Sequence, residues 1–234
     1  MHAFKQRCEG NEASHQPLKG NRMQVLVIGA GNMGAAFVKQ LSAAGHSVSV
    51  TARDAAKVAA LAAQYSGVKA VAAASAADGK DVVVLATGYG DAVSALQSVG
   101  NLQGKVVVDI TNPLTADYMG LTVGHSTSAA EEIARAIPGA EVVKAFNTLF
   151  APVIAEGGDF GQGKVAPAFV ASDSEQAKQT VKELAQSLGF AVVDAGGLKN
   201  ARYLEPLAGL NIYLGYGAGL GTSIAPTWIS RQGK

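Results

Sequence analysis

Short apolar segments recur along the chain at intervals long enough to hold a helix. Six of these segments are rich in valine, and they lie at 24–28, 47–51, 68–71, 81–86, 105–110 and 141–146. Such little-interrupted apolar runs are typical of strands that are buried on both faces of a sheet. Alanine-rich helical segments lie between them, at 35–44, 55–65 and 92–99. The alternation predicts an α/β protein with a doubly wound parallel sheet.

A further unit of the same kind follows in the C-terminal part of the chain. The pattern predicts a strand at 168–171, a helix capped by Asp173 and a strand at 190–194. A last helix begins near Lys199, and Pro206 either lies in its first turn or kinks it. No low-complexity linker separates this unit, so we expect a small C-terminal α/β extension packed on the sheet.

Composition and charge narrow the possible partners. The 234 residues include 19 basic and 18 acidic side chains, so no excess positive field is available for a phosphate backbone and we expect no nucleic-acid partner. The single cysteine, Cys8, excludes a disulfide framework. No group of His, Cys and carboxylate residues has metal-ligand spacing, so we expect no metal site.

The two ends of the chain differ in their polarity. Residues 1–22 carry several charges and no apolar run, so we expect a flexible extension that is neither a signal peptide nor an anchor. Residues 207–229 carry no charge, but their glycines, an asparagine and a proline make them too weakly apolar for a membrane span. We expect a buried helix and a close-packed glycine loop there, no membrane insertion, and a cytoplasmic protein.

A glycine-rich turn directly follows the first predicted strand. Residues 29–34 read Gly-Ala-Gly-Asn-Met-Gly and fit the pattern G-x-G-x-x-G at the start of a helix. Gly29 permits the tight turn, Gly31 lets the backbone approach a pyrophosphate, and Gly34 lets the helix pack on the strand. The phosphates then meet unpaired N–H groups at the helix N-terminus. The alternatives are a turn selected only for packing, and a mononucleotide or flavin in the same groove.

The end of the second predicted strand bears on which dinucleotide binds. NAD-binding folds place an acid there for the adenosine ribose, whereas this strand ends Thr51-Ala52-Arg53. Arg53 can pair with a 2′-phosphate and stack on adenine, and Lys57 can reach the same anion from one helical turn later. This favours NADP(H). In the competing interpretations Asp54 is the ribose acid of an NAD site, although it is placed to cap the next helix, or Arg53 is only a solvated charge.

Several segments together resemble a known family. The glycine turn, Thr51-Ala52-Arg53, residues 141–148 and residues 194–205 are similar to the F420-dependent NADP oxidoreductases and to the NADPH-binding domains of the six-transmembrane metalloreductases. The resemblance covers the chain from about Met23 onward. It implies a Rossmann-type domain, usually in a homodimer, that moves hydride between NADP(H) and a deazaflavin (F420) or flavin ring.

The resemblance also implies a set of cofactor-binding positions and a division of the chain. Besides the three glycines, the phosphate and adenosine end would be lined by Ala30, Asn32, Met33, Thr51, Arg53 and Lys57. The ribose and nicotinamide would be lined by Thr87, Asn112, Pro113 and Ala145, at the ends of the fourth, fifth and sixth strands. Residues 23–148 would form the NADP-binding Rossmann domain and 149–234 the extension on the acceptor and dimer side. The fourth and fifth strand ends are closer to bacterial and metalloreductase-like members than to the archaeal F420 enzymes.

We name no catalytic residue, because hydride transfer between two bound rings requires stacking and exclusion of water and does not require a protein acid or base. His46 is expected to be a surface histidine. His125 either borders the acceptor or lies in a loop whose serines cap the next helix. His2 and His15 belong to the N-terminal extension.

The aromatic residues near the C-terminus allow two interpretations. Tyr213 and Tyr216, with the glycines up to Gly221, form either a flat platform for a flavin-like ring or a buried helix and dimer contact. Phe146 and Asn147 are either packing residues or nicotinamide contacts.

The main hypothesis is therefore an NADP(H)-dependent oxidoreductase that passes hydride between NADPH and F420, a flavin or a related acceptor. An NADPH-dependent imine or carbonyl reductase is the second enzyme hypothesis, because pyrroline carboxylate reductases share the Gly-Ala-Gly-Asn-Met turn. Their long helical C-terminal domain has no counterpart in this sequence. A non-catalytic NADP(H)-binding sensor or partner protein is the alternative from another class.

Overall fold

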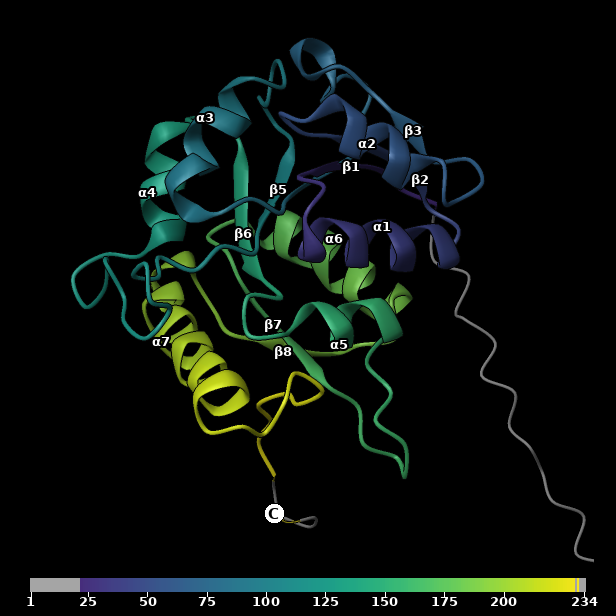
Figure 1. Ribbon diagram of the computed structural model, residues 1–234. Helices are drawn as coiled ribbons and strands as arrows, with labels where there is room; N and C mark the ends of the chain where they lie inside the picture. The colour runs from purple at the N-terminus through teal and green to yellow at the C-terminus, as the bar shows by residue number, and fades with distance from the viewer. Residues whose placement is uncertain (1–21, 230, 232–234) are drawn as a thin grey trace, which may run out of the picture.

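Eight strands form one sheet in the computed structural model, which describes residues 22–229 and 231 (Figure 1). Their order across the sheet is β3-β2-β1-β4-β5-β6-β7-β8. The strands are β1 Gln24–Ile28, β2 Ser47–Thr51, β3 Lys69–Ala70, β4 Val82–Leu85, β5 Val106–Asp109, β6 Glu141–Ala145, β7 Pro167–Ala171 and β8 Ala191–Asp194. The flexible extension predicted for residues 1–22, with Cys8, His2 and His15, lies outside the described residues apart from Arg22.

The direction of the strands confirms the Rossmann-type α/β fold and adds one feature. Strands β1 to β6 are all parallel, with β1 and β4 adjacent where the winding reverses. Strand β7 runs antiparallel to β6, and β8 is parallel to β7. We did not predict this reversal, because a short run of buried apolar residues reads the same in either direction. It allows the helix after β8 to return toward the carboxyl ends of β1 to β6.

The helices form two layers, one on each face of the sheet. One layer contains α1 Asn32–Ala43, α2 Ala55–Ala62, α5 Ala151–Glu156 and α6 Glu175–Ser187; the other contains α3 Ala92–Gln97 and α4 Ala129–Ala136. Helix α7, Ala201–Ile212, contacts α4 and continues into a π-helical turn, Tyr213–Gly217. Short 3-10 turns lie at Ala73–Ser75, Tyr89–Asp91 and Leu198–Asn200.

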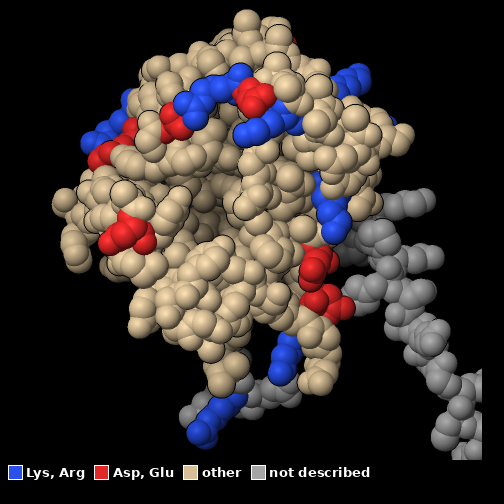
Figure 2. All heavy atoms as spheres, viewed as in Figure 1, with Lys and Arg blue, Asp and Glu red and all other residues tan. Residues whose placement is uncertain are grey.

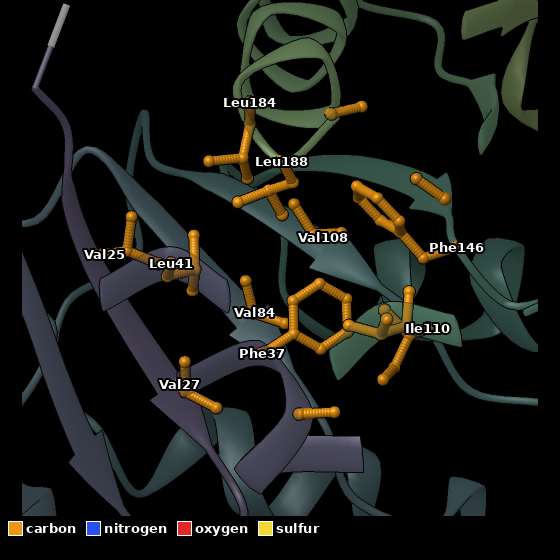
Figure 3. Packing of buried hydrophobic residues seen from close by; sticks show 14 of the residues in the cluster. Val25, Val27, Phe37, Leu41, Val84, Val108, Ile110, Phe146, Leu184 and Leu188 are labelled. Atoms are coloured by element: carbon orange, nitrogen blue, oxygen red, sulfur yellow. The ribbon is translucent and has the colours of Figure 1, made fainter. Parts of the chain in front are cut away.

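Alternate strand residues supply the two cores. Val25 and Val27 face the α1 layer, whereas Leu26 and Ile28 face the α3 layer. On the first side, Phe37 of α1 points toward Val84 and Val108 of the sheet, with Leu184 and Leu188 from the α6 segment nearby (Figure 3). Phe146 packs edge-to-face on Phe37, at 5.3 Å between ring centroids, and on Phe190, at 5.8 Å. The C-terminal segment therefore shares one core with the first half of the chain.

The helix caps confirm one prediction and correct another. The Asp54 carboxylate accepts a hydrogen bond from the Lys57 backbone N–H, so Asp54 caps α2 as expected. Helix α6 is capped by Ser174 and not by Asp173. The Asp173 carboxylate instead accepts from the backbone N–H of Leu198 and thereby holds the segment that leads into α7.

His46 is buried, so the expectation of a surface histidine is wrong. Its Nδ1 accepts from the backbone N–H of Met23 at 3.2 Å, and its Nε2 lies 2.8 Å from Oγ of Ser187. The Ser187 hydroxyl donates to the Leu184 carbonyl, so it accepts from His46 Nε2–H. A neutral imidazole thus connects the start of β1 with the end of α6.

The uncharged C-terminal segment, residues 207–229, forms the second half of α7, the π-helical turn and the residues that follow. Residues 216–221 are exposed, so the expectation of a close-packed glycine loop is wrong. Pro206 lies inside α7, beyond its first turn. Within the described part of the chain, no helix is long and apolar enough to cross a membrane.

Candidate functional site

The glycine turn between β1 and α1 is forced by backbone contacts. Gly29 has φ +122°, and its N–H donates to the Thr51 carbonyl at 2.8 Å. A Cβ at Gly29 would fall on the carbonyl oxygen of Ala86, and a Cβ at Gly34 would fall on that of Gly29. Two of the three predicted glycine roles, the tight turn and the close packing of helix on strand, therefore have a direct steric cause.

The third glycine faces open space at the N-terminus of α1. Gly31 is the N-cap residue, supplies no side-chain cap, and has no atom within 4 Å of an added Cβ. The first N–H groups of this 12-residue helix have no intrahelical partner. The arrangement suits a phosphate, because the helix dipole and these donors both favour an anion.

A large cavity begins at this helix terminus. Its volume is about 1170 Å³, above the usual range of about 300–1000 Å³ for a single-ligand pocket. It lies at the carboxyl ends of β1, β4, β5 and β6, where doubly wound sheets bind ligands. Figure 2 shows the hollow near the centre of one face, with an arc of charged side chains above it and an uncharged lobe directly below.

The tip of β2 carries the predicted cationic residues outside the cavity lining. Arg53 is highly exposed, and its Nη1 and Nη2 donate to the two carboxylate oxygens of Asp91 at 3.2 and 3.0 Å. Lys57 is exposed as well, with Nζ 3.8 Å from Asp54 Oδ2. Thr51 is buried, and it contributes its carbonyl to the Gly29 turn.

The ends of β4 and β5 form the middle of the cavity. Thr87 and Asn112, two of the predicted cofactor-binding positions, line it. The Asn112 side chain donates to the Asn147 carbonyl at 2.9 Å, which ties the end of β5 to the end of β6. Pro113 is buried and is not part of the lining.

The segment after β6 turns sharply into the cavity. Ala145 and Phe146 are fully buried, so Phe146 is a packing residue. Its φ of +58° is an uncommon conformation for an aromatic residue. The next two residues, Asn147 and Thr148, line the cavity.

Three residues of this region hold polar atoms without a hydrogen-bond partner among the described residues. These atoms are Oγ1 of Thr111, Oδ1 of Asn147 and Oγ1 of Thr148, and all three residues line the cavity. The Asn147 amide group is oriented by its Nδ2, which donates to Asn112 Oδ1 and the Leu204 carbonyl. The ends of β5 and β6 therefore concentrate unsatisfied polar groups beneath the cavity.

A buried ion cluster lies below the same strand ends. Lys144 Nζ is 2.7 Å from Asp109 Oδ2 and 3.0 Å from Glu205 Oε1, and all three side chains are inaccessible to solvent or nearly so. The contact with Asp109 is an ion pair without an aligned hydrogen bond. Lys144 also donates to the Thr111 carbonyl at 2.7 Å. Glu205 accepts from the N–H groups of Ala129 and Ala130, so the cluster connects α7, α4 and the sheet.

Tyr89 is a lining residue with a perturbed hydroxyl. Burial, together with the hydrogen bond that it donates to Glu132, raises its pKa to about 12. Tyr89 therefore stays protonated in the neutral range and fixes the β4 loop to α4.

The C-terminal wall of the cavity combines aromatic and glycine residues. Tyr216 lines the cavity and packs edge-to-face on Phe150, at 5.6 Å between ring centroids. A Cβ at Gly215 would lie 2.6 Å from the Phe150 ring. Tyr213 is half exposed and is not part of the lining, so only one of the two tyrosines can belong to a platform.

The remaining candidates lie away from the cavity. His125 is exposed and does not line it, whereas Ser128 caps α4 as expected of the loop serines. No group of three or more His, Cys, Asp or Glu side chains within the described ranges is arranged to hold a metal ion.

The structure thus brings together part of the predicted set. Gly31, Asn32, Met33, Thr87 and Asn112 line one cavity. The other predicted positions do not line it: Gly29, Ala30 and Gly34 belong to the glycine turn, Thr51, Pro113 and Ala145 are buried, and Arg53 and Lys57 are exposed at and after the β2 tip. Sequence reasoning missed Thr111, Thr148 and Asn211. The first two follow strand ends, which is the signal that could have found them. Asn211 is brought in by α7 and had no local signal.

Comparison of the sequence with known proteins identifies a family model and several related proteins. A family model described as NADP oxidoreductase coenzyme F420-dependent matches residues 24–113. The chain is 30% identical over 185 residues to Metalloreductase STEAP3 of Rattus norvegicus, which covers 79% of this chain and 36% of that protein. It is 32% identical over 106 residues to Metalloreductase STEAP2 of Homo sapiens, which covers 45% of this chain and 20% of that protein. The chain thus spans about a third or less of the metalloreductases that it matches.

Solved structures extend the relationship over most of the chain. A protein from Arthrobacter sp. FB24, provisionally named an F420-dependent NADP-reductase, superposes with a TM-score of 0.79 at 31% identity, covering 89% of this chain and all of that one. An imine reductase from Aspergillus terreus shares the fold, with a TM-score of 0.62 at 20% identity over 85% of this chain and 63% of that one. The chain belongs to the family of F420-dependent NADP oxidoreductases.

Proposed function

We propose that the protein binds NADP(H) along the carboxyl edge of β1 to β6 and transfers hydride between NADPH and a flavin or deazaflavin ring. The observation that carries this proposal is that one continuous cavity reaches from the N-terminus of α1 to the wall formed by α7 and Tyr216. Its volume leaves room for a dinucleotide end and a second ring. In this proposal residues 23–148 bind the cofactor, and 149–234 form the acceptor and dimer side.

The α1 end fits the pyrophosphate of the cofactor. Gly31 leaves space where phosphate oxygens would approach the backbone. Asn32 and Met33 border the same space. The N–H groups of the first helical turn are the donors.

The β2 tip fits a 2′-phosphate better than a free ribose hydroxyl. Asp54 is engaged as the cap of α2, which leaves the tip without a free carboxylate of the NAD-specific kind. The Arg53–Asp91 pair is exposed, and such pairs contribute little to stability, so a phosphate can replace the carboxylate on the guanidinium. Lys57 adds a second positive charge one turn away.

The bound dihydronicotinamide would supply a hydride at its C4 position. The residues of the chain orient and shield this reaction. Thr87 and Asn112 border the middle of the cavity, Asn147 and Thr148 line its floor, and Tyr216 covers its far side. Orientation and exclusion of water suffice for transfer between two rings.

The cofactor half of the proposal is tested by binding. In calorimetric titrations, Arg53→Ala should weaken NADPH by about tenfold to a hundredfold, the value of a charge-assisted pair, and change NADH by less than about threefold. Arg135→Ala, which removes an exposed arginine on α4, is the matched control and should change neither. Equal small losses for both cofactors in Arg53→Ala would contradict the assignment.

The reaction is tested with a panel of acceptors. We expect oxidation of NADPH, followed at the nicotinamide absorbance, with F420, FMN, FAD or riboflavin. Ferric chelates and cyclic imines belong in the panel, because the relatives are named metalloreductases and the fold neighbours imine reductases. Oxidation only by cyclic imines would favour the imine reductase function. Tight NADPH binding without oxidation by any acceptor would favour a sensor.

We also propose a homodimer formed through the outer face of α7. Tyr203, Leu210 and Tyr213 are at least half exposed and recur on one side of this helix. Light scattering should give twice the chain mass, and Leu210→Arg should shift the protein to monomer. A monomeric wild type at micromolar concentration would contradict this proposal.

A further inference from the structure

The wall of the cavity opposite the α1 terminus is built from uncharged residues. Leu114 and Tyr118 come from the loop after β5, Phe150 from the start of α5, and Ile212 and Tyr216 from α7 and its π-helical turn. Apolar and aromatic surface of this kind suits the face of a planar ring.

Charge is confined to the other parts of the site. Among the described residues that line the cavity, Lys39 is the one Lys, Arg, Asp or Glu side chain. It lies on α1, two helical turns after Asn32, and not on the acceptor wall. The chain has no charged residue between positions 206 and 229. The lobe below the hollow in Figure 2 is correspondingly uncharged.

Two of the polar side chains of the wall already donate hydrogen bonds within the protein. The Asn211 Nδ2 donates to the Thr148 carbonyl at 3.0 Å, and the Thr122 hydroxyl donates to the Pro113 carbonyl at 3.1 Å. An anion needs donors, and these two donate elsewhere. A phosphate or carboxylate held against this wall would lose its hydration without gaining a charged partner.

We infer that the acceptor is recognised through its uncharged ring alone, and that an anionic tail on the acceptor adds nothing to binding. The inference rests on the proposed function and concerns the acceptor half of the same cavity. It contrasts with the cofactor, whose 2′-phosphate we assign to Arg53. Acceptors that share a ring and differ in their tails should therefore be equivalent substrates.

The reaction balances for such a ring. In the proposed reaction the hydride would leave C4 of the dihydronicotinamide with its electron pair, which would give the oxidised cofactor, and would form a bond to N5 of a flavin or C5 of a deazaflavin. A proton from water at N1 completes the reduced ring. No step involves the tail.

Binding to the protein loaded with NADP⁺ tests this inference directly. Quenching of acceptor fluorescence gives dissociation constants for two pairs, riboflavin with FMN, and the tail-free deazaflavin with F420. We expect the members of each pair to agree within about threefold. Raising the salt from low to physiological concentration should weaken NADPH and leave the acceptor constants unchanged.

A positive charge placed on the acceptor wall should create a preference for an anionic acceptor, which we expect the wild type to lack. Thr222 lines the cavity and is half-buried, so Thr222→Lys should make FMN bind about tenfold better than riboflavin. Val193→Lys, at an exposed position on β8 outside the lining, is the matched control and should leave the two flavins equal.

The outcomes separate this inference from the function on which it rests. A preference of about tenfold or more for FMN or F420 in the wild type would overturn it, and so would failure of all four acceptors to bind. Failure to bind NADP⁺ would instead overturn the proposed function. Thermal unfolding of Thr222→Lys with NADP⁺ present shows whether the variant has kept its fold.

Discussion

The two ends of the cavity differ in how they are built. The cofactor end consists of one short segment, residues 29–34, held by backbone contacts and flanked by cations at the β2 tip. The acceptor wall is assembled from residues 114–122, 147–155 and 208–222, which are far apart in the sequence and carry no charge in the lining. An anion requires donors in fixed positions, whereas an uncharged ring requires only apolar surface. The fixed donors of the cofactor end therefore produce a recognisable sequence motif, whereas the apolar surface of the acceptor wall does not.

Both ends use glycine, but with different neighbours. A Cβ on Gly34 would meet a backbone carbonyl, which cannot move without distorting β1 and its turn. A Cβ on Gly215 would meet mainly the ring of Phe150, a side chain that lines the cavity, and would lie 3.1 Å from the Gly221 carbonyl oxygen, a milder backbone contact. Substitution at the first position should therefore cost much more than substitution at the second.

The largest effect is expected for Gly34→Ala. Because the added methyl would overlap the Gly29 carbonyl, we expect a loss of about 5 kcal/mol or more in the free energy of unfolding, enough to leave little folded protein. Circular dichroism and denaturant titration measure this loss.

Gly31→Ala is the matched control for that substitution. Its Cβ meets no atom within 4 Å, so the fold should keep its stability while NADP(H) affinity falls by at least about tenfold. Normal NADPH binding by Gly31→Ala would contradict the position assigned to the pyrophosphate.

The contrast between the two ends also explains what the sequence could predict. The strands, the winding of the sheet, the glycine turn and the Asp54 cap follow from local patterns and were predicted. The reversal at β7, the buried state of His46 and the position of Tyr213 depend on contacts with distant segments. Phe146, directly before the lining residue Asn147, has a positive φ that the local sequence does not predict.

The buried ion cluster holds α7 and α4 to the sheet, and its disruption should give the next largest effect. Lys144→Met leaves Asp109 and Glu205 buried without their cation, so we expect a loss of about 3–5 kcal/mol in the free energy of unfolding. Lys182→Met breaks a more exposed pair with Asp194 and should cost less than about 1 kcal/mol. Similar costs for the two variants, measured by urea unfolding, would show that the cluster does not hold α7 to the sheet.

Gly215→Ala should have an intermediate effect that is confined to the acceptor wall. The added methyl displaces the Phe150 ring and with it Tyr216, at an overpacking cost of about 1–3 kcal/mol. Calorimetry should give unchanged NADP⁺ binding and weakened flavin binding. Gly124→Ala, whose Cβ meets no atom within 4 Å, is the control and should change neither. A weakened NADP⁺ affinity in Gly215→Ala would mean that the two ends are not separable.

The smallest effect is expected from pH, through the histidine that connects the two halves of the chain. Burial lowers the pKa of His46 below its usual 6.5, so the folded state binds fewer protons than the unfolded state. The stabilising contribution is complete above the unfolded pKa of 6.5 and is lost as the pH falls toward the lowered value, because protonation of Nδ1 removes the acceptor of the Met23 N–H. The melting temperature should therefore fall as the pH is lowered through this range. His46→Gln should abolish the difference in melting temperature across this range, and His125→Gln, at an exposed histidine, should leave it in place. An unchanged difference in His46→Gln would assign the acid sensitivity to other groups.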